Sequence, residues 1–122
     1  MKRDLDLIRI LLAEIEKNND PTKTCTVRAE GYAPVVIAYH LKLLKDGGLV
    51  VARDCSTESQ MDYRPKSLTW AGHEFLDAVR NETIWRQVMA KLKDQGLEVP
   101  FSLIQQLATK FGASMLGLGN GA

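Results

Sequence analysis

The sequence predicts an α+β fold, and two stretches of the chain support this prediction. The first, Pro34 to Val50, is an amphipathic helix that ends at two glycines and continues directly into an apolar strand. The second, Leu68 to Leu76, is a strand end, a threonine cap and the start of another helix. Helix, strand, loop, strand and helix in this order are the last elements of a winged helix-turn-helix domain. A fold of this kind is typical of binding modules.

The chain has 122 residues, enough for one compact domain with a buried core, and 45% of them are hydrophobic. No apolar stretch approaches the length of a membrane span. Asp4 and Asp6 interrupt the apolar run that a signal peptide would need. Cys25 and Cys55 match no metal-binding spacing, and thiols of the cytoplasm are usually reduced. We therefore expect a cytoplasmic protein.

The charges nearly balance, with 16 Lys and Arg against 15 Asp and Glu and a net charge of +1. Dedicated nucleic-acid binders usually carry a positive excess, because phosphate contacts supply most of their non-specific affinity. A neutral chain can still bind DNA if its charges are sorted onto one face. The overall charge therefore does not decide between DNA and a protein as the partner.

Apolar residues at helical spacing predict a first helix from about Arg3 to Asn18, with acidic residues in its first turn. A second helix begins at Pro34, a residue suited to the first helical position, and has an inner stripe of Ile37, Leu41 and Leu44. Thr69 is a good cap for a third helix that carries Phe75, Leu76 and Val79.

Three strands are predicted. Residues 24–30 alternate small or polar residues with Cys25, Val27 and Ala29, which favours a short strand. Residues 49–53 and 63–68 form a hairpin around a polar loop, and Pro65 confines the second of these strands to an edge.

The remaining helices form an extension after residue 80. Asn81 to Thr83 either caps a fresh helix or lies within a continuing one, and a helical stripe then runs to Gly96. A last helix follows Pro100, and residues 118–122 resemble a frayed tail. We expect residues 1–80 to form the winged-helix-like core and residues 81–122 a helical extension packed on the same domain.

Residues 34–76 resemble the winged-helix pattern of small bacterial regulators. The matching motifs are His40-Leu-Lys-Leu-Leu44, Gly48-Leu-Val50 and Leu68-Thr-Trp-Ala-Gly-His-Glu-Phe-Leu76. The whole chain more specifically resembles a family of small, uncharacterised bacterial and phage proteins that open with "MKRDxDLIR" and continue with "LTWxGHxFLDxxRxxTIW". That resemblance covers nearly the full length. It implies the fold and an association with phages or prophages, and no activity.

One feature departs from the regulator pattern. A helix-turn-helix needs a support helix directly before its recognition helix, and here residues 21–33 are predicted to form a strand and a turn. The support helix is either lacking or reduced to a single turn. This departure weakens the case for DNA binding.

The predicted outer face of the helix at Pro34 is poor in hydrogen-bonding groups. A helix that reads DNA usually presents donors and acceptors, because base edges and phosphates require them. Val35, Tyr39, Lys42 and Asp46 point outward instead. The alternatives are cover by the C-terminal helices, a protein interface and a DNA contact. The candidate residues for a partner interface are Val35, Val36, Tyr39 and Leu43.

Basic residues on this helix and on the hairpin are the candidates for phosphate contacts. They are Lys42, Lys45, Arg53, Arg64 and Lys66. Asp54, Glu58 and Asp62 lie among them, so the simpler interpretation is a solvated hairpin with scattered ion pairs.

No catalytic or metal-binding constellation emerges from the sequence. His40 and His73 lack further ligands at a suitable spacing, so we expect each to pack or to form hydrogen bonds. Neither a phosphate-binding glycine loop nor a nucleophile elbow is present, so no enzyme activity and no cofactor are expected. Trp70 and Trp85 are expected in the core, with an interface hot spot as the alternative.

Two functions from different classes remain. The first is a DNA-binding regulator of bacterial or phage origin. The second is a phage or prophage protein that binds a host or phage protein, for example as an anti-defence inhibitor. The last helix either pairs two protomers or folds back over the helix at Pro34, and its candidate dimerisation residues are Ile104, Leu107, Phe111 and Met115.

Overall fold

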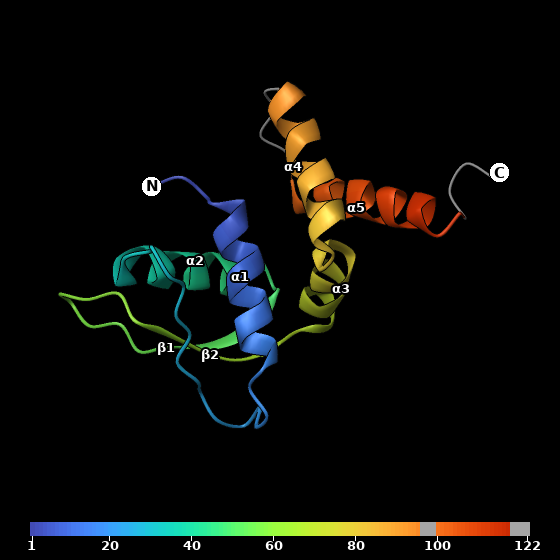
Figure 1. Cartoon of the computed structure of the whole chain (residues 1–122). Coiled ribbons are helices and arrows are strands. Elements are labelled where there is room, and N and C mark those ends of the chain that lie inside the picture. Colours follow the sequence, from blue (N-terminus) through green and yellow to red (C-terminus); the bar gives the residue numbers. More distant parts are fainter. Residues whose placement is uncertain (96–99, 118–122) are drawn as a thin grey trace. The chain divides into compact units, whose positions relative to one another are not determined.

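The computed structural model describes residues 1–95 and 100–117, and it confirms the α+β class (Figure 1). Over these residues the chain forms five helices and one antiparallel two-stranded sheet. The elements are α1 (Leu5–Glu16), α2 (Pro34–Asp46), β1 (Val50–Asp54), β2 (Tyr63–Leu68), α3 (Trp70–Val79), α4 (Glu82–Gln95) and α5 (Phe101–Met115). The order α2, β1, β2, α3 is the predicted order of helix, strand, strand and helix.

The chain divides into two compact units, Met1–Glu74 and Phe75–Ala122. The division falls within α3, a short distance before the boundary that the sequence suggested near residue 80. We call them unit 1 and unit 2 and describe each by itself.

Helix α1 forms where the sequence predicted it. Five of its apolar residues are buried, namely Leu7, Ile8, Leu11, Leu12 and Ile15. The side chain of Asp4 caps the helix by accepting a hydrogen bond from the backbone N–H of Leu7 at 3.0 Å. No acidic or basic residue other than Asp6 complements the helix dipole in the first and last turns. Burial of the apolar stripe is therefore the main source of stability of this helix.

Helix α2 is also confirmed, but its inner face differs from the predicted stripe. Leu41 and Leu44 are buried as expected, together with Ala38 and His40. Ile37 was predicted to face inward and is instead partly exposed. The buried face of α2 therefore includes the polar side chain of His40. The helical spacing of apolar residues alone does not predict this position.

The hairpin is confirmed with small shifts at its ends. Val50 pairs with Leu68 and Val51 with Ser67, and the register then shifts so that Ala52 pairs with Pro65. Lys66 is therefore the extra residue of a β-bulge.

A threonine joins the hairpin to α3. Thr69 Oγ1 accepts a hydrogen bond from the N–H of Gly72 at 3.1 Å, as the predicted helix cap requires, and donates one to the carbonyl of Gly48 at 2.6 Å. Thr69 N–H also bonds to the carbonyl of Leu49. These bonds hold the start of α3 against the start of β1.

The predicted strand at residues 24–30 is wrong. This segment runs extended beside β2, but the one hydrogen bond to the strand in the described part of the chain joins the N–H of Cys25 to the carbonyl of Pro65 at 2.8 Å. The neighbouring carbonyl of Lys66 accepts from the side chain of Asn18 instead. A period-two pattern indicates which side chains face inward. It does not show whether the backbone forms hydrogen bonds with a neighbouring strand.

No helix lies between α1 and α2, all of whose connecting residues the structure describes. The support helix of a helix-turn-helix is therefore absent from this position. The connection ends in a turn at Gly31, whose φ of 85° favours glycine.

In unit 2 a fresh helix begins after Asn81, whose side chain accepts from the N–H of Ile84 at 3.0 Å. Helices α4 and α5 pack together, and Ile84, Trp85, Val88, Ile104 and Ala108 are buried. The rings of Phe75 and Phe101 meet edge to face with centroids 4.8 Å apart. Gly96 and the predicted tail at residues 118–122 lie outside the described residues.

The two tryptophans differ. Trp85 is buried, as predicted, whereas the prediction of a core position for Trp70 is wrong because its side chain is 81% exposed. The indole N–H of Trp70 donates to the carboxylate of Glu74, which lies one helical turn later on the solvent side. The N–H of this exposed ring therefore has a partner within the protein.

Candidate binding groove and its surroundings

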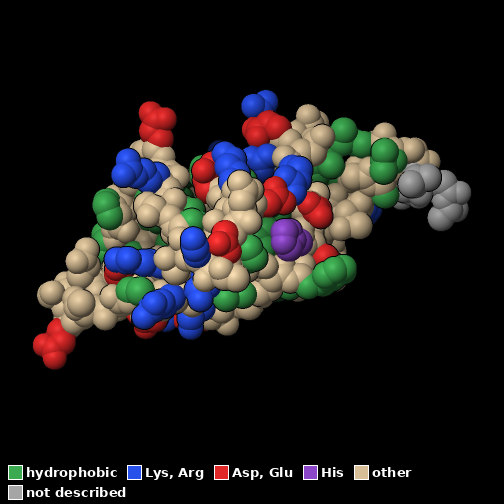
Figure 2. Space-filling model, turned by 90° about the horizontal axis from the view of Figure 1, so that it is seen from below, with side chains coloured by type: hydrophobic (Ala, Val, Ile, Leu, Met, Phe, Trp, Pro, Cys, Tyr) green, Lys and Arg blue, Asp and Glu red, His purple; other side chains and the backbone are tan. Residues whose placement is uncertain are grey.

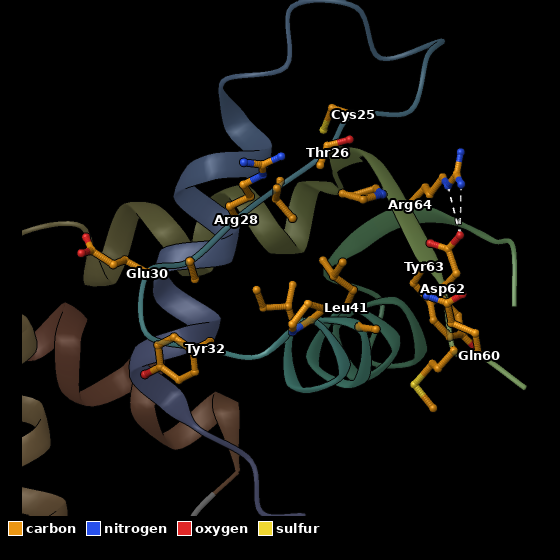
Figure 3. Close-up of a pocket in the computed structure, with 17 residues that line it drawn as sticks. Cys25, Thr26, Arg28, Glu30, Tyr32, Leu41, Gln60, Asp62, Tyr63 and Arg64 are labelled. Carbon is orange, nitrogen blue, oxygen red and sulfur yellow. Dashed lines mark hydrogen bonds and ion pairs between the residues drawn. The ribbon is translucent and has the colours of Figure 1, made fainter.

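An open groove of about 880 Å³ lies on unit 1, between the extended segment 25–30, the first half of α2, and residues 60–65 at the start of β2 (Figure 3). We call it the α2 groove. Its apolar lining residues are Val27, Ala29, Pro34, Ile37, Ala38, Leu41, Met61 and Pro65. Its other lining residues are Cys25, Thr26, Arg28, Glu30, Tyr32, Gln60, Asp62, Tyr63 and Arg64.

The groove has the shape of a wedge. The extended segment and β2 meet where Cys25 bonds to Pro65, and from there the two arms separate, with α2 between them (Figure 3). The combination of an apolar lining with polar groups at the margin is typical of binding clefts in proteins.

A hydrogen-bonded network fixes the wide end of the groove. Tyr32 donates its hydroxyl to Asp4 Oδ2 at 3.0 Å, and the backbone N–H of Asp4 donates to His40 Nε2 at 2.8 Å. His40 Nδ1 lies 2.8 Å from the carbonyl of Val36. Because Nε2 accepts a hydrogen bond, the proton of the neutral ring must be on Nδ1, where it is donated to Val36. Burial and the bond to Asp4 raise the pKa of the Tyr32 phenol.

His40 is fully buried, and these two bonds confirm the prediction of a hydrogen-bonding residue. The network joins three separate parts of the chain, namely the cap of α1, the end of the extended segment and the middle of α2. His73 is exposed and lies 3.9 Å from the carboxylate of Glu16.

Two of the five candidate phosphate contacts are held by acidic partners. Lys42 Nζ lies 2.8 Å from Asp46 Oδ2, and this hydrogen bond raises the pKa of the lysine. The guanidinium of Arg64 lies 3.1 Å from Asp62 Oδ2, and that bond raises the pKa of the arginine. Both pairs are solvent-exposed, so each contributes little to stability, yet each cancels a charge that a phosphate would need.

A third candidate also has an acidic neighbour. Hydrogen bonds from Ser56 lower the pKa of Asp54, and Tyr63 and the positive charge of Lys45 act in the same direction. Lys45 therefore lies within electrostatic range of a carboxylate, without an ion pair to it among the described residues. Arg53 and Lys66 remain as candidates without an acidic partner in the described part of the chain.

The charges of unit 1 are thus interleaved and not sorted. Its sequence contains 11 Lys and Arg residues and 11 Asp and Glu residues. The face drawn in Figure 2 likewise shows basic side chains with acidic ones among them. One local exception is the pair Arg53 and Arg64, which are cross-strand partners and so point to the same face of the hairpin.

The outer face of α2 offers few polar groups. Val35 is 57% exposed, and Val36, Tyr39 and Leu43 are partly buried. The ring of Tyr39 packs edge-on against His40, with centroids 5.8 Å apart. In α5, Ile104 is fully buried and so has no surface to offer a second copy, whereas Leu107 and Phe111 are partly exposed and Met115 is exposed.

Among the described residues, no three His, Cys, Asp or Glu side chains lie close enough together to hold a metal ion, and Cys25 and Cys55 are free thiols. Burial raises the pKa of the Cys25 thiol, which lowers its reactivity at neutral pH. None of the helices in the described ranges is long and apolar enough to span a membrane.

Sequence reasoning missed the α2 groove because its lining comes from three segments that are distant along the chain. The only local signal was the period-two pattern at residues 24–30, which marked an extended segment. Where that segment separates from β2 depends on tertiary packing.

These observations define a small α+β protein whose distinctive surface feature is an open groove beside a central helix. The chain belongs to the family of hypothetical proteins designated DUF2513, whose model matches residues 2–98. It is also similar to an uncharacterized protein of Haemophilus influenzae, with 34% identity over 117 residues, which are 95% of this chain and 99% of that protein. No solved structure matches the chain. The predicted membership in a small uncharacterised family is thus confirmed.

Proposed function

We propose that this protein is a non-enzymatic binding module with a winged-helix-like core, and that it binds another protein in the α2 groove. The observation that carries this proposal is the groove itself, an open cleft with an apolar lining on the helix that would read DNA in a winged-helix regulator. Apolar contacts of this kind favour a protein partner, since they offer nothing to phosphate.

The charges around α2 support the same proposal. A DNA-reading surface needs donors that are free to approach bases and phosphates. Lys42 and Arg64 are paired, the positive charge of Lys45 lies within electrostatic range of Asp54, and the described connection before α2 contains no support helix. DNA would have to displace or outcompete the acidic groups.

Two substitutions on α2 test this proposal. Ile37 lines the groove, whereas Val35, two residues earlier, is exposed on the outer face and does not line it. Ile37→Arg should abolish recovery of a specific protein from a lysate of the bacterium that encodes the chain, while Val35→Arg should leave recovery unchanged. Quantitative mass spectrometry measures the recovery, and thermal denaturation confirms that both variants fold.

Two results would contradict the proposal. Equal recovery by Ile37→Arg and the native chain would exclude the groove. Loss of recovery with Val35→Arg alone would move the interface to the outer face of α2, with Val36, Tyr39 and Leu43 as its neighbours.

The second candidate function is a DNA-binding regulator. The specific observation in its favour is the cross-strand pair Arg53 and Arg64 on the hairpin, with Lys66 at the adjacent bulge. A hairpin that carries cations on one face resembles the wing of a winged helix, which contacts the phosphate backbone.

A mobility-shift assay with bulk DNA tests this second candidate. If DNA is the partner, binding at low salt should weaken with rising salt, and Arg53→Ala combined with Lys66→Ala should reduce the salt dependence by about two phosphate contacts. Lys93→Ala on α4 is the matched control. Our proposal predicts no saturable DNA binding even at low salt.

The expectations of an association with phages, of inhibition of a host defence protein, of a homodimer and of a cytoplasmic location stay predictions. A protein-binding groove is compatible with each of them.

A further inference from the structure

We infer that the α2 groove takes one extended segment of its partner, which adds as a strand beside residues 26–30 and carries an acidic and a basic side chain two residues apart. This inference rests on the proposed function and specifies the chemistry of the bound segment.

The first argument is the free backbone of the extended segment. The N–H of Cys25 points to β2, where it bonds to Pro65. Because N–H directions alternate along an extended chain, the N–H of Val27 points to the same side, into the widening groove. Within the described part of the chain, the N–H groups of Thr26, Val27 and Arg28 have no hydrogen-bond partner. An unpaired extended backbone is a template for another strand.

The second argument is the divergence of the two arms. Residues 25–30 and 60–65 run in opposite directions from their contact at Cys25 and Pro65, and α2 lies between them (Figure 3). Alternate side chains of a strand added here would face α2 and meet Ile37, Ala38 and Leu41. The bound segment should therefore have apolar residues at every second position.

The third argument is charge complementarity. Arg28 and Glu30 are exposed, and Figure 3 shows both side chains pointing away from α2. Neither has an ionic partner in the described ranges. They are two residues apart, so they lie on the same side of the extended segment. Opposite charges directly across two strands are favourable, so an acidic residue should lie beside Arg28 and a basic one beside Glu30.

A capped peptide with the sequence Thr-Val-Glu-Val-Lys-Val-Thr is the first probe, and the same sequence with the charges exchanged covers the opposite strand direction. Titration into the full-length, ¹⁵N-labelled protein should shift the amide signals of Val27 and Arg28 and slow hydrogen exchange at Val27. Peptides with Glu-Val-Glu or Lys-Val-Lys at the centre should bind about two- to fivefold more weakly. A peptide that is N-methylated at two consecutive central residues should lose binding, because it lacks donors on both edges.

The variant Arg28→Glu sharpens the test, since it makes both charged positions acidic at an exposed site. The Lys-Val-Lys peptide should then become the tightest binder by about the same factor. An unchanged ranking of the peptides would overturn the charge pattern, and binding without slower exchange at Val27 would overturn strand addition.

The outcome separates this inference from the proposed function. If no peptide perturbs the groove at millimolar concentration while recovery of a protein still depends on Ile37, strand addition is wrong and the protein-binding function stands. If recovery does not depend on Ile37 either, the groove is not the binding site.

Discussion

The imidazole ring of His40 holds three segments of unit 1 together. Its Nε2 accepts a hydrogen bond from the backbone N–H of Asp4 at the start of α1, and its Nδ1 donates one to the carbonyl of Val36 within α2. The carboxylate of Asp4 in turn accepts a hydrogen bond from the hydroxyl of Tyr32. Buried polar groups are stabilising only while their partners are present, because an unpaired donor in the interior is costly. The network is therefore a structural device that sets one end of the α2 groove.

His40→Ala should lower the free energy of unfolding by about 2–4 kcal/mol, because it leaves the N–H of Asp4 unpaired and opens a cavity. Urea denaturation measures this change. The matched control is His73→Ala on the exposed start of α3, which should change stability by less than about 0.5 kcal/mol. Equal effects of the two substitutions would show that the network does not stabilise the fold.

The two tryptophans differ in burial, although the same argument predicted a core position for both. Trp85 and Trp70 both follow the hairpin, and both were expected in the core on the basis of size and hydrophobicity. Trp70 occupies the first position of α3, where its ring is exposed and its N–H donates to Glu74. Its surface position depends on the direction in which α3 leaves the hairpin.

At the scale of elements, the helices and the hairpin were predictable because each has a local signal. Ile8, Leu11 and Ile15 repeat at helical spacing, Thr69 forms the predicted cap, and β2 has the predicted bounds. Residues 24–30 have the alternating sequence pattern of a strand but do not form one. A strand needs a continuous partner, and among the described residues β2 forms one hydrogen bond with this segment before the two separate.

Two glycines in helices should respond to alanine with opposite signs. A Cβ at Gly72 would lie 2.0 Å from the backbone oxygen of Leu49, so Gly72→Ala should destabilise the protein by about 3 kcal/mol or more. A Cβ at Gly112 would lie 3.5 Å from Ile84 Cδ1, an ordinary contact, so Gly112→Ala should stabilise α5 by about 0.5–1 kcal/mol. Thermal denaturation of both variants measures the two changes. A tolerated alanine at Gly72 would contradict the close approach of α3 to β1.

At the scale of the whole molecule, positive and negative charges nearly cancel, so their distribution over the surface decides whether DNA can bind. The sequence left two answers open, since a neutral chain can still sort its charges onto one face. In the structure Lys42 and Arg64 form ion pairs with acidic residues, and Lys45 lies within electrostatic range of Asp54, so three of the five candidate phosphate contacts have negative charge near them. The pairs Lys42–Asp46 and Arg64–Asp62 are close in sequence and were visible in principle. The electrostatic effect of Lys45 on Asp54 depends on the packing of α2 against β1.

The α2 groove has no counterpart in the sequence as a continuous motif. Its lining combines residues around Val27, Ile37 and Tyr63, and it opens because the connection between α1 and α2 is an extended segment in the place of a support helix. The feature that weakened the prediction of DNA binding is thus the feature that forms the groove.

Photo-crosslinking from the margin of the groove tests the central claim most directly. A benzophenone amino acid at Gln60, which is exposed and lines the groove, reports the class of molecule that lies there in living cells. The control position is Lys110, which is exposed on α5 in unit 2. We predict a discrete protein adduct from position 60 that is absent from position 110. Nucleic-acid adducts, or no adduct specific to position 60, would contradict the protein-binding function of the α2 groove.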